Sequence, residues 1–148
     1  MELIPKFSSA QVSLVAHATE EPHKLLSAVE TFLGIPALSF SETKTEGHFK
    51  NSITLLTCSL SSKNARELAT KVISLLKAGD IDKIEQSLHH YSDEKGNLYL
   101  RIDKQHLCQG KITLGESDAV RIRFRPVHRY KPSGNFEMIR GLISSSTE

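Results

Sequence analysis

The segment 120–125 constrains the fold of this chain most, because it alternates strictly between apolar residues and arginine. Successive side chains of a β-strand point to opposite faces, so this period-two pattern predicts a strand that is buried on one side only. Arg121, Arg123 and Arg125 are then expected together on the outer face. Residues 98–103 repeat the alternation. Strands of this kind are typical of an antiparallel sheet with one solvated face.

Other segments have the 3.6-residue periodicity of helices. A first helix is predicted to begin near Thr19 and to stop at Gly34, a second to run from Ser61 or Ser62 to Gly79, and a third to be capped by Asp80. Further strands are predicted at 11–18, 38–46, 53–60 and 110–114, with a helical turn at 103–109. Residues 38–46 are polar and predict an edge strand. The order of elements predicts an α+β fold, a mostly antiparallel sheet with helices packed on one face.

The length of 148 residues suits one domain with one hydrophobic core. We expect an N-terminal extension over 1–9 and a single α+β domain over 10–125. Periodicity fades after Pro126, so 126–148 is interpreted as a basic, flexible tail with a short helix around 136–142.

Basic residues concentrate in the last third of the chain. Residues 1–96 hold ten basic and twelve acidic side chains, a formal charge of −2, whereas 97–148 hold nine and five, a charge of +4. The whole-chain charge of +2 is too small to indicate a nucleic-acid or membrane partner. Its distribution favours an anionic partner for the C-terminal third.

Several function classes lack their motifs in this sequence. It contains no glycine-rich phosphate loop and no nucleophile elbow, and the spacings His106 to Cys108 and His89 to His90 do not match a zinc site. We therefore predict a protein without catalytic residues, cofactor or metal. Two isolated cysteines, no signal-peptide pattern and no long apolar run predict a cytoplasmic protein without a membrane partner.

The arginines of 120–125 are the best functional candidates. Alternate residues on a strand are about 6.6 Å apart, so three guanidinium groups would line up along a rigid sheet and meet a phosphodiester backbone. If 98–103 is the neighbouring strand, Tyr99 and Arg101 extend the same face with an aromatic ring and another cation. The auxiliary cations are Lys104, Lys50, Arg129 and Lys131. Alternatively, the arginines only cover apolar surface or pair with acids.

A resemblance to a known family adds to this interpretation. It is carried by Asn97–Gln105 (NLYLRIDKQ), Asp118 with Val120–Arg123, Val15–Glu20 and Glu46–His48, and covers about residues 10–125. The chain resembles a family of small archaeal proteins described as predicted RNA-binding proteins and candidate exosome subunits. The resemblance implies an α+β fold similar to the ribosomal protein that carries 5S RNA, with no enzymatic activity.

We therefore expect a non-catalytic RNA-binding protein, an accessory subunit of an exosome-like RNA-processing assembly. The sequence is also compatible with a homodimer. The alternative is a protein-interaction subunit without nucleic-acid contact, docking through the edge strand near Phe40 or through the tail. A nucleotide-processing enzyme would require a pocket that clusters His17, His48 and His106.

Overall fold

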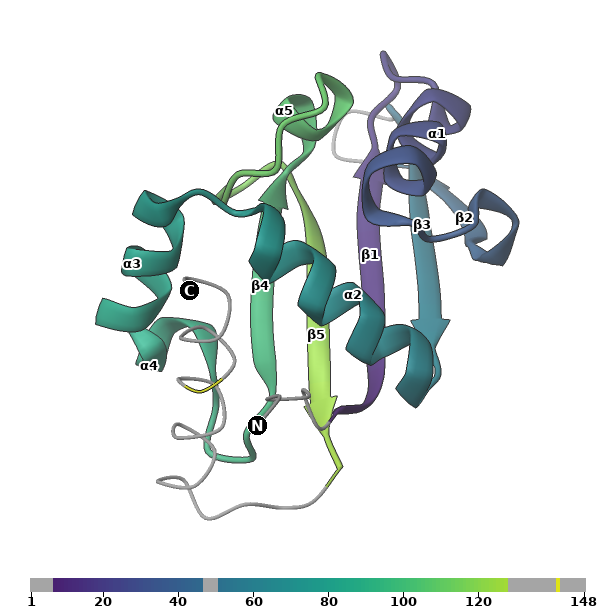
Figure 1. The fold of residues 1–148 in the computed structure, drawn as a ribbon. Helices are drawn as coiled ribbons and strands as arrows, with labels where there is room; N and C mark the ends of the chain where they lie inside the picture. Colours follow the sequence, from purple (N-terminus) through teal and green to yellow (C-terminus); the bar gives the residue numbers. More distant parts are fainter. Residues whose placement is uncertain (1–6, 47–50, 128–140, 142–148) are drawn as a thin grey trace. The chain divides into compact units, whose positions relative to one another are not determined.

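The protein is an α+β protein with a five-stranded antiparallel sheet, and the predicted fold class is confirmed (Figure 1). A computed structural model describes residues 7–46, 51–127 and 141. The order of strands in the sheet is β2-β3-β1-β5-β4. The elements are β1 (Phe7–Ala16), α1 (Pro22–Leu33), the 3-10 helix η1 (Ala37–Ser39), β2 (Ser41–Glu46), β3 (Ser52–Leu60), α2 (Ser62–Leu75), α3 (Ala78–Gln86), α4 (Leu88–Tyr91), β4 (Leu98–Asp103), α5 (Lys104–Cys108) and β5 (Ala119–Pro126).

The chain divides into two compact units. The first comprises 1–10, 60–100 and 123–148, and the second comprises 11–59 and 101–122. Helices α2, α3 and α4 belong to the first unit, whereas α1, β2 and α5 belong to the second. Strands β1, β3, β4 and β5 have residues in both units.

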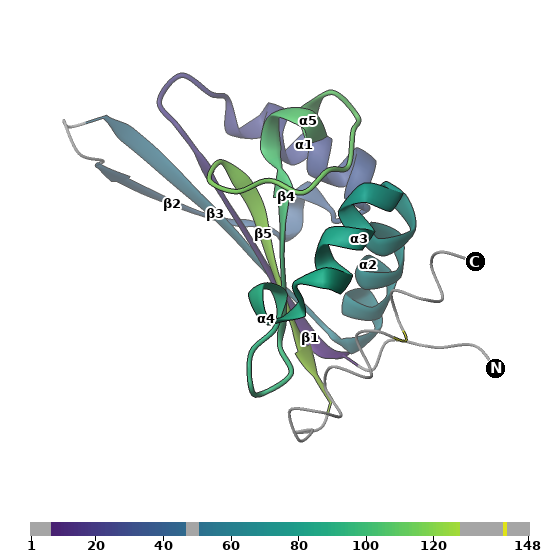
Figure 2. The ribbon, with the colours of Figure 1, turned by 90° about the vertical axis from the view of Figure 1, so that its left-hand side faces the viewer.

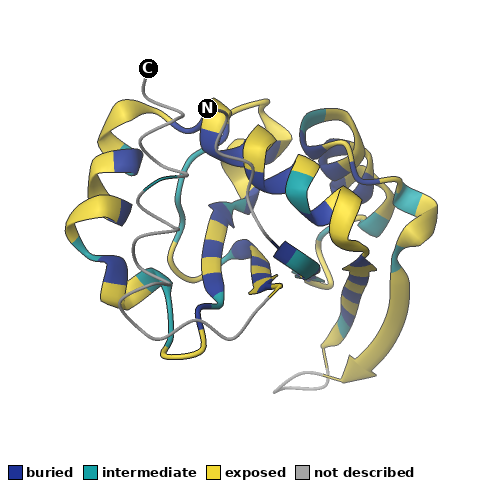
Figure 3. Ribbon diagram, turned by 60° about the horizontal axis from the view of Figure 1, so that its bottom comes forward, coloured by how far each residue is buried: buried dark blue, intermediate teal, exposed yellow. Residues whose placement is uncertain are grey.

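The first unit has an aliphatic core with one aromatic pair. The buried stripe of α2 consists of Ala65, Leu68, Ala69, Val72 and Ile73. Phe7 and Phe124 are both almost fully buried, and their ring centroids are 5.1 Å apart with an interplanar angle of 31°. Tilted pairs at this distance contribute stability beyond the area that they bury. The alternation of buried and exposed residues along the strands is visible as bands in Figure 3.

The second unit packs α1 against α5 and extends β3 with an edge strand. Figure 2 shows α5 beside α1, and the two helices are in contact. Phe32 of α1 lies 3.2 Å from where a Cβ on Gly110 would be, and Gly110 has φ of +81°, so this turn requires glycine. Strands β2 and β3 pair antiparallel from Ser41 opposite Thr57 to Glu46 opposite Ser52. Every residue of β2 is exposed, as expected for a polar edge strand.

Some predicted boundaries were wrong. Strand β1 covers Phe7–Ala16 rather than 11–18, because the apolar face starts with the buried Phe7. The short strand at 110–114 is absent, and only Leu114 forms an isolated bridge, to Ile102. Helix α2 ends at Leu75, and Gly79, which was predicted to end it, lies inside α3. A Cβ added at Gly79 would meet no atom within 4 Å.

The predicted end of the first helix is confirmed. Gly34 ends α1 with a left-handed φ of 74°. Cys58 and Cys108 are both free thiols. Within 7–46, 51–127 and 141, no helix has the length and apolar character needed to cross a membrane. The predicted helix at 136–142 and most of the tail lie outside the described residues.

Candidate nucleic-acid interface

Strand β5 presents arginine to solvent at every second position. Arg121, Arg123 and Arg125 are exposed, and the residues between them are at most 1% exposed. The hydroxyl of Ser8 donates to the carbonyl of Pro126 at 3.2 Å, which holds the end of the strand. The apolar face anchors β5 in the core, so the long cationic side chains are directed to the other face of the strand.

Strand β4 is the neighbour of β5 in the sheet, as the sequence argument required. Its outward residues include Tyr99, which is 39% exposed, and Arg101, which is also exposed. Nη1 of Arg101 donates to the carbonyl of Glu116 at 3.0 Å. A guanidinium group has five N–H donors, so this bond fixes Arg101 and leaves donors for a ligand.

A tight turn fixes the hydroxyl of Tyr99. The Tyr99 hydroxyl donates to Oδ2 of Asp93 at 2.7 Å, and Oδ1 of Asp93 accepts from the amides of Lys95 and Asn97, both at 3.0 Å. Burial raises the pKa of Asp93, but these bonds and the side chain of Asn97 outweigh it and lower the pKa. The bond to Asp93 raises the pKa of Tyr99, so its ring stays neutral. Sequence reasoning missed Asp93, although the turn chemistry of 92–97 contained the signal.

Lys104 does not lie with the exposed cations. It is 1% exposed, and its ammonium group contacts three oxygens at 2.7 Å, namely the carbonyl of Val15, Oε1 of Glu20 and Oδ1 of Asp118. An ammonium group has three N–H donors, so this set uses all of them. Lys104 therefore connects segments of the fold that are far apart in the sequence. We remove it from the proposed RNA contacts.

Lys104 helps to lower the pKa of both carboxylates of this cluster. Burial raises the pKa of Glu20, but the bond to Lys104 and the amide of His17 outweigh it and lower the pKa. Burial likewise raises the pKa of Asp118, but its contacts with Lys104, Gln105 and His17 outweigh burial. The net effect is a lowered pKa. Nε2 of His17 lies 3.5 Å from Oδ1 of Asp118. Lys104 therefore offsets one of the two negative charges of Glu20 and Asp118, and its contacts help to lower the pKa of both acids.

The remaining predicted residues fall into two groups. Asp103 accepts from the amide of His106 at 2.8 Å, so it caps α5 in the helical turn predicted at 103–109. Lys50, Arg129 and Lys131 lie outside the described residues.

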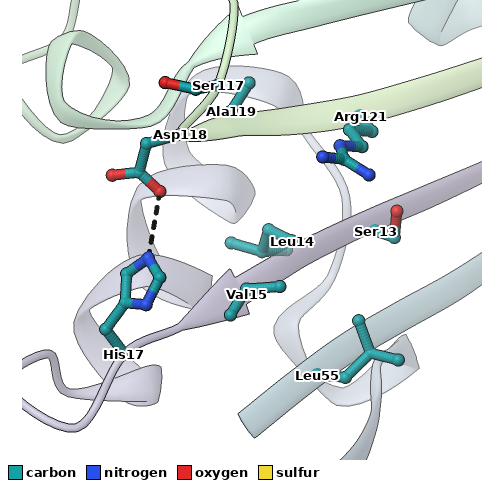
Figure 4. A pocket seen from close by; sticks show the side chains of 9 residues that line it. All are labelled: Ser13, Leu14, Val15, His17, Leu55, Ser117, Asp118, Ala119 and Arg121. Atoms are coloured by element: carbon teal, nitrogen blue, oxygen red, sulfur yellow. Dashed lines mark ion pairs between the residues drawn. The ribbon is translucent and has the colours of Figure 1, made fainter. Parts of the chain in front are cut away.

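A pocket of about 230 Å³ opens in the second unit (Figure 4). Leu55 of β3, Ser13 and Val15 of β1 and Arg121 of β5 line it, together with Asp118 and its neighbour Ser117. His17 also lines this pocket. An enzyme would have needed His17, His48 and His106 together, but His106 does not line the pocket. His106 contacts Thr113 at 2.8 Å instead, and His48 lies outside the described residues.

Metal ligands do not gather in the described part of the chain. No group of three histidine, cysteine, aspartate or glutamate side chains there is arranged to hold an ion. Where Glu20 and Asp118 approach each other, the ammonium group of Lys104 lies between them.

An antiparallel sheet that presents arginines and a tyrosine on neighbouring strands is typical of proteins that bind nucleic acids on a sheet surface. The comparison with family models agrees with this class. Residues 9–125 match the model described as RNA binding, and the chain belongs to that RNA-binding family.

Relatives support the assignment along most of the chain. An RNA-binding protein of Pyrococcus abyssi is 30% identical over 115 residues, which cover 74% of this chain and 75% of the relative. An uncharacterised protein of Methanocaldococcus jannaschii is 26% identical over 93% of this chain and 96% of its own length. The crystal structure of a DUF54 protein from Archaeglobus fulgidus has a TM-score of 0.78 and 27% identity, with 93% of this chain and 99% of that chain covered.

Proposed function

We propose that this protein is a non-catalytic RNA-binding module that holds the phosphates of single-stranded RNA on the outward face of β5 and β4. The observation that carries the proposal is the strict alternation of exposed arginine and buried apolar residues in β5. Arg101 on the neighbouring strand adds a cation, and Tyr99 adds a ring on which a base can stack. Membership of the RNA-binding family supports the choice of RNA as the polyanion.

The salt dependence of binding measures how many phosphates are held. Each neutralised phosphate of a single strand contributes about −0.7 to the slope of log affinity against log salt, so three arginines give a slope of about −2. We would titrate a labelled, mixed-sequence single-stranded RNA at several salt concentrations with the wild type and with the triple variant R121Q/R123Q/R125Q. The triple variant is expected to bind weakly, and the magnitude of its salt slope is expected to fall by about 2.

A matched control removes the same charge elsewhere. Lys63 and Lys71 of α2 and Lys77 beyond its end are exposed, and K63Q/K71Q/K77Q changes the net charge by the same amount. This control is expected to keep the wild-type slope. Equal slopes for the wild type and the arginine variant would refute the proposed surface.

The finer proposal is that the protein acts in the cytoplasm as an accessory subunit of an exosome-like assembly, and it rests on the sequence resemblance. Co-purification with RNA-degrading subunits from extract treated with nuclease tests it. Light scattering of the purified chain tests the homodimer.

A second candidate function is docking of a protein strand on β2. All six residues of this edge strand are exposed, and Leu38 just before it is fully exposed. However, β2 carries Glu42, Lys44 and Glu46, and charged edge strands discourage pairing with another chain. A partner that stays bound at high salt and is lost on T43P substitution would favour this function over RNA binding.

A further inference from the structure

The pocket of the second unit combines one strong cation with an apolar wall. In Figure 4, Arg121 of β5 lies on one side of the pocket and Leu55 of β3 on the other, and β1, which carries Ser13 and Val15, runs between them. The ion pair drawn among the lining residues joins His17 to Asp118, and Arg121 takes no part in it. The guanidinium group is therefore presented to the pocket rather than used to pair the carboxylate there.

The side of the pocket formed by Arg121 favours an anion. Asp118 is the acid in the lining, and Lys104 contacts its Oδ1 at 2.7 Å from the buried side. Lys104 also pairs with Glu20, so it offsets the negative charge of Asp118 in part, while the positive charge of Arg121 is paired with no residue of the lining. The hydroxyl groups of Ser13 and Ser117 add donors that suit phosphate and sugar oxygens.

The size of the pocket indicates what kind of anion it takes. Its volume of about 230 Å³ lies below the roughly 300–1,000 Å³ of pockets that enclose a whole small molecule or cofactor. The pocket therefore suits one unit of a polymer whose chain continues outside it. A nucleotide has the required combination of an anionic phosphate, a hydroxyl-bearing sugar and an apolar base face.

We propose that this pocket binds one ribonucleotide of the RNA strand. Its phosphate is held by Arg121 and Ser13, its base lies against Leu55 and Val15, and its ribose hydroxyls meet the polar end formed by Ser117 and the His17–Asp118 pair. This inference rests on the proposed function, because the same strand continues across the arginines of β5. It adds a subsite with a contact that is not electrostatic.

The first test separates the apolar wall from the arginines. Leu55 is 37% exposed, so L55Q alters the pocket without opening the core. We expect L55Q to weaken RNA binding about tenfold, which corresponds to about 1.4 kcal/mol, and to leave the salt slope unchanged. The control is L75Q, because Leu75 is 45% exposed and does not line the pocket. It is expected to bind like the wild type.

The second test compares two arginines of the same strand. R121Q and R125Q remove the same charge, so each should reduce the magnitude of the salt slope by about 0.7. Only Arg121 lines the pocket, so R121Q is expected to lose about fivefold more affinity than R125Q. If the two lose equal affinity and L55Q binds like the wild type, the subsite is refuted and the RNA surface stands. If the wild type itself shows no RNA binding, both proposals fail.

The third test distinguishes a nucleotide from phosphate alone. The wild type is titrated with uridine 5′-monophosphate, its 2′-deoxy counterpart and inorganic phosphate while backbone amide shifts are followed by NMR. We expect the ribonucleotide to shift the amides of 13–17, Leu55 and 117–121, the deoxynucleotide to do so more weakly, and L55Q to abolish the response. Equal shifts with inorganic phosphate would overturn the nucleotide assignment, and equal shifts with the deoxynucleotide would overturn the role given to the ribose hydroxyls.

Discussion

Replacing Lys104 by methionine is expected to destabilise the protein strongly, because its ammonium group serves two carboxylates and a carbonyl at once. Breaking a buried ion pair by removing one partner costs about 3–5 kcal/mol, since the other partner is left uncompensated. Here the side chain of Glu20 is 17% exposed and that of Asp118 is 41% exposed, so water solvates part of the freed charge. We therefore expect K104M to lower the free energy of unfolding by about 3 kcal/mol at neutral pH.

The size of the effect is measured by chemical and thermal unfolding. For a chain of this length about 3 kcal/mol corresponds to a fall in Tm of roughly 6–12 °C. The control is K24M. Nζ of Lys24 lies 3.9 Å from Glu21, and its side chain is 80% exposed. Such surface pairs contribute about 0.2–1 kcal/mol, so K24M should change stability little.

The pH dependence tests the cause of the loss. Lys104 contributes to lowering the pKa values of Glu20 and Asp118 below their ordinary values of 4.5 and 3.8. A carboxyl whose pKa is lowered by folding stabilises the native state above its unfolded pKa and loses that contribution as pH falls through the folded pKa. The stability difference between wild type and K104M should therefore be largest near neutrality and shrink below a pH of about 4. A difference that stays constant as the acids are protonated would show that Lys104 stabilises by packing, and would refute the electrostatic argument.

Three further predictions concern the supports of the sheet. A Cβ at Gly115 would lie 2.8 Å from the backbone of β4, so G115A should lower the free energy of unfolding by about 1–3 kcal/mol, measured in urea. The control is G79A, whose Cβ would meet no atom within 4 Å and which should not destabilise the protein. F124A removes a fully buried ring and its aromatic partner contact, and should cost about 3–5 kcal/mol by the same assay. D93N removes the main cause of the raised pKa of Tyr99, so Tyr99 should ionise at lower pH in an NMR titration, and an unchanged titration would contradict the bond to Asp93.

The sheet could be predicted because its signal is local. In β5 and β4 each residue is assigned to a face by its immediate neighbours, and the buried and exposed positions follow that alternation. Where the pattern was weaker, local reasoning failed. Residues 110–114 have strand-like composition, but only Leu114 forms a β-bridge, to Ile102, and the carbonyl of Thr113 accepts from the amide of Asp103 at 2.8 Å. Gly79 resembles a helix stop, but the chain had already turned at Leu76 and Lys77, both of which have extended backbones.

The position of Lys104 could not be predicted from its neighbours. Its partners Val15 and Glu20 are 89 and 84 residues away in the sequence, and only the folded chain brings them to the start of α5. The pocket was missed for the same reason, because Leu55, Arg121 and Ser13 lie on three different strands. Arg121 was predicted as an RNA contact and His17 as part of a histidine cluster, but no local pattern linked either residue to Leu55.

The positions of the acids determine which cations can serve a ligand. Glu20 and Asp118 hold Lys104, Asp103 caps α5, and Asp93 binds Tyr99 and its own turn, so each of these four acids is committed to donors inside the fold. A cation beside such an acid forms an ion pair inside the fold and cannot contact a ligand. Lys104 is an example, although it lies in the segment 97–105 that carries the family resemblance. Arg121 has the same charge, but the carboxylate of the pocket lining, Asp118, is already in contact with Lys104. We therefore expect the buried lysine to support the proposed RNA surface indirectly, because it holds Asp118 in a pair that does not include Arg121.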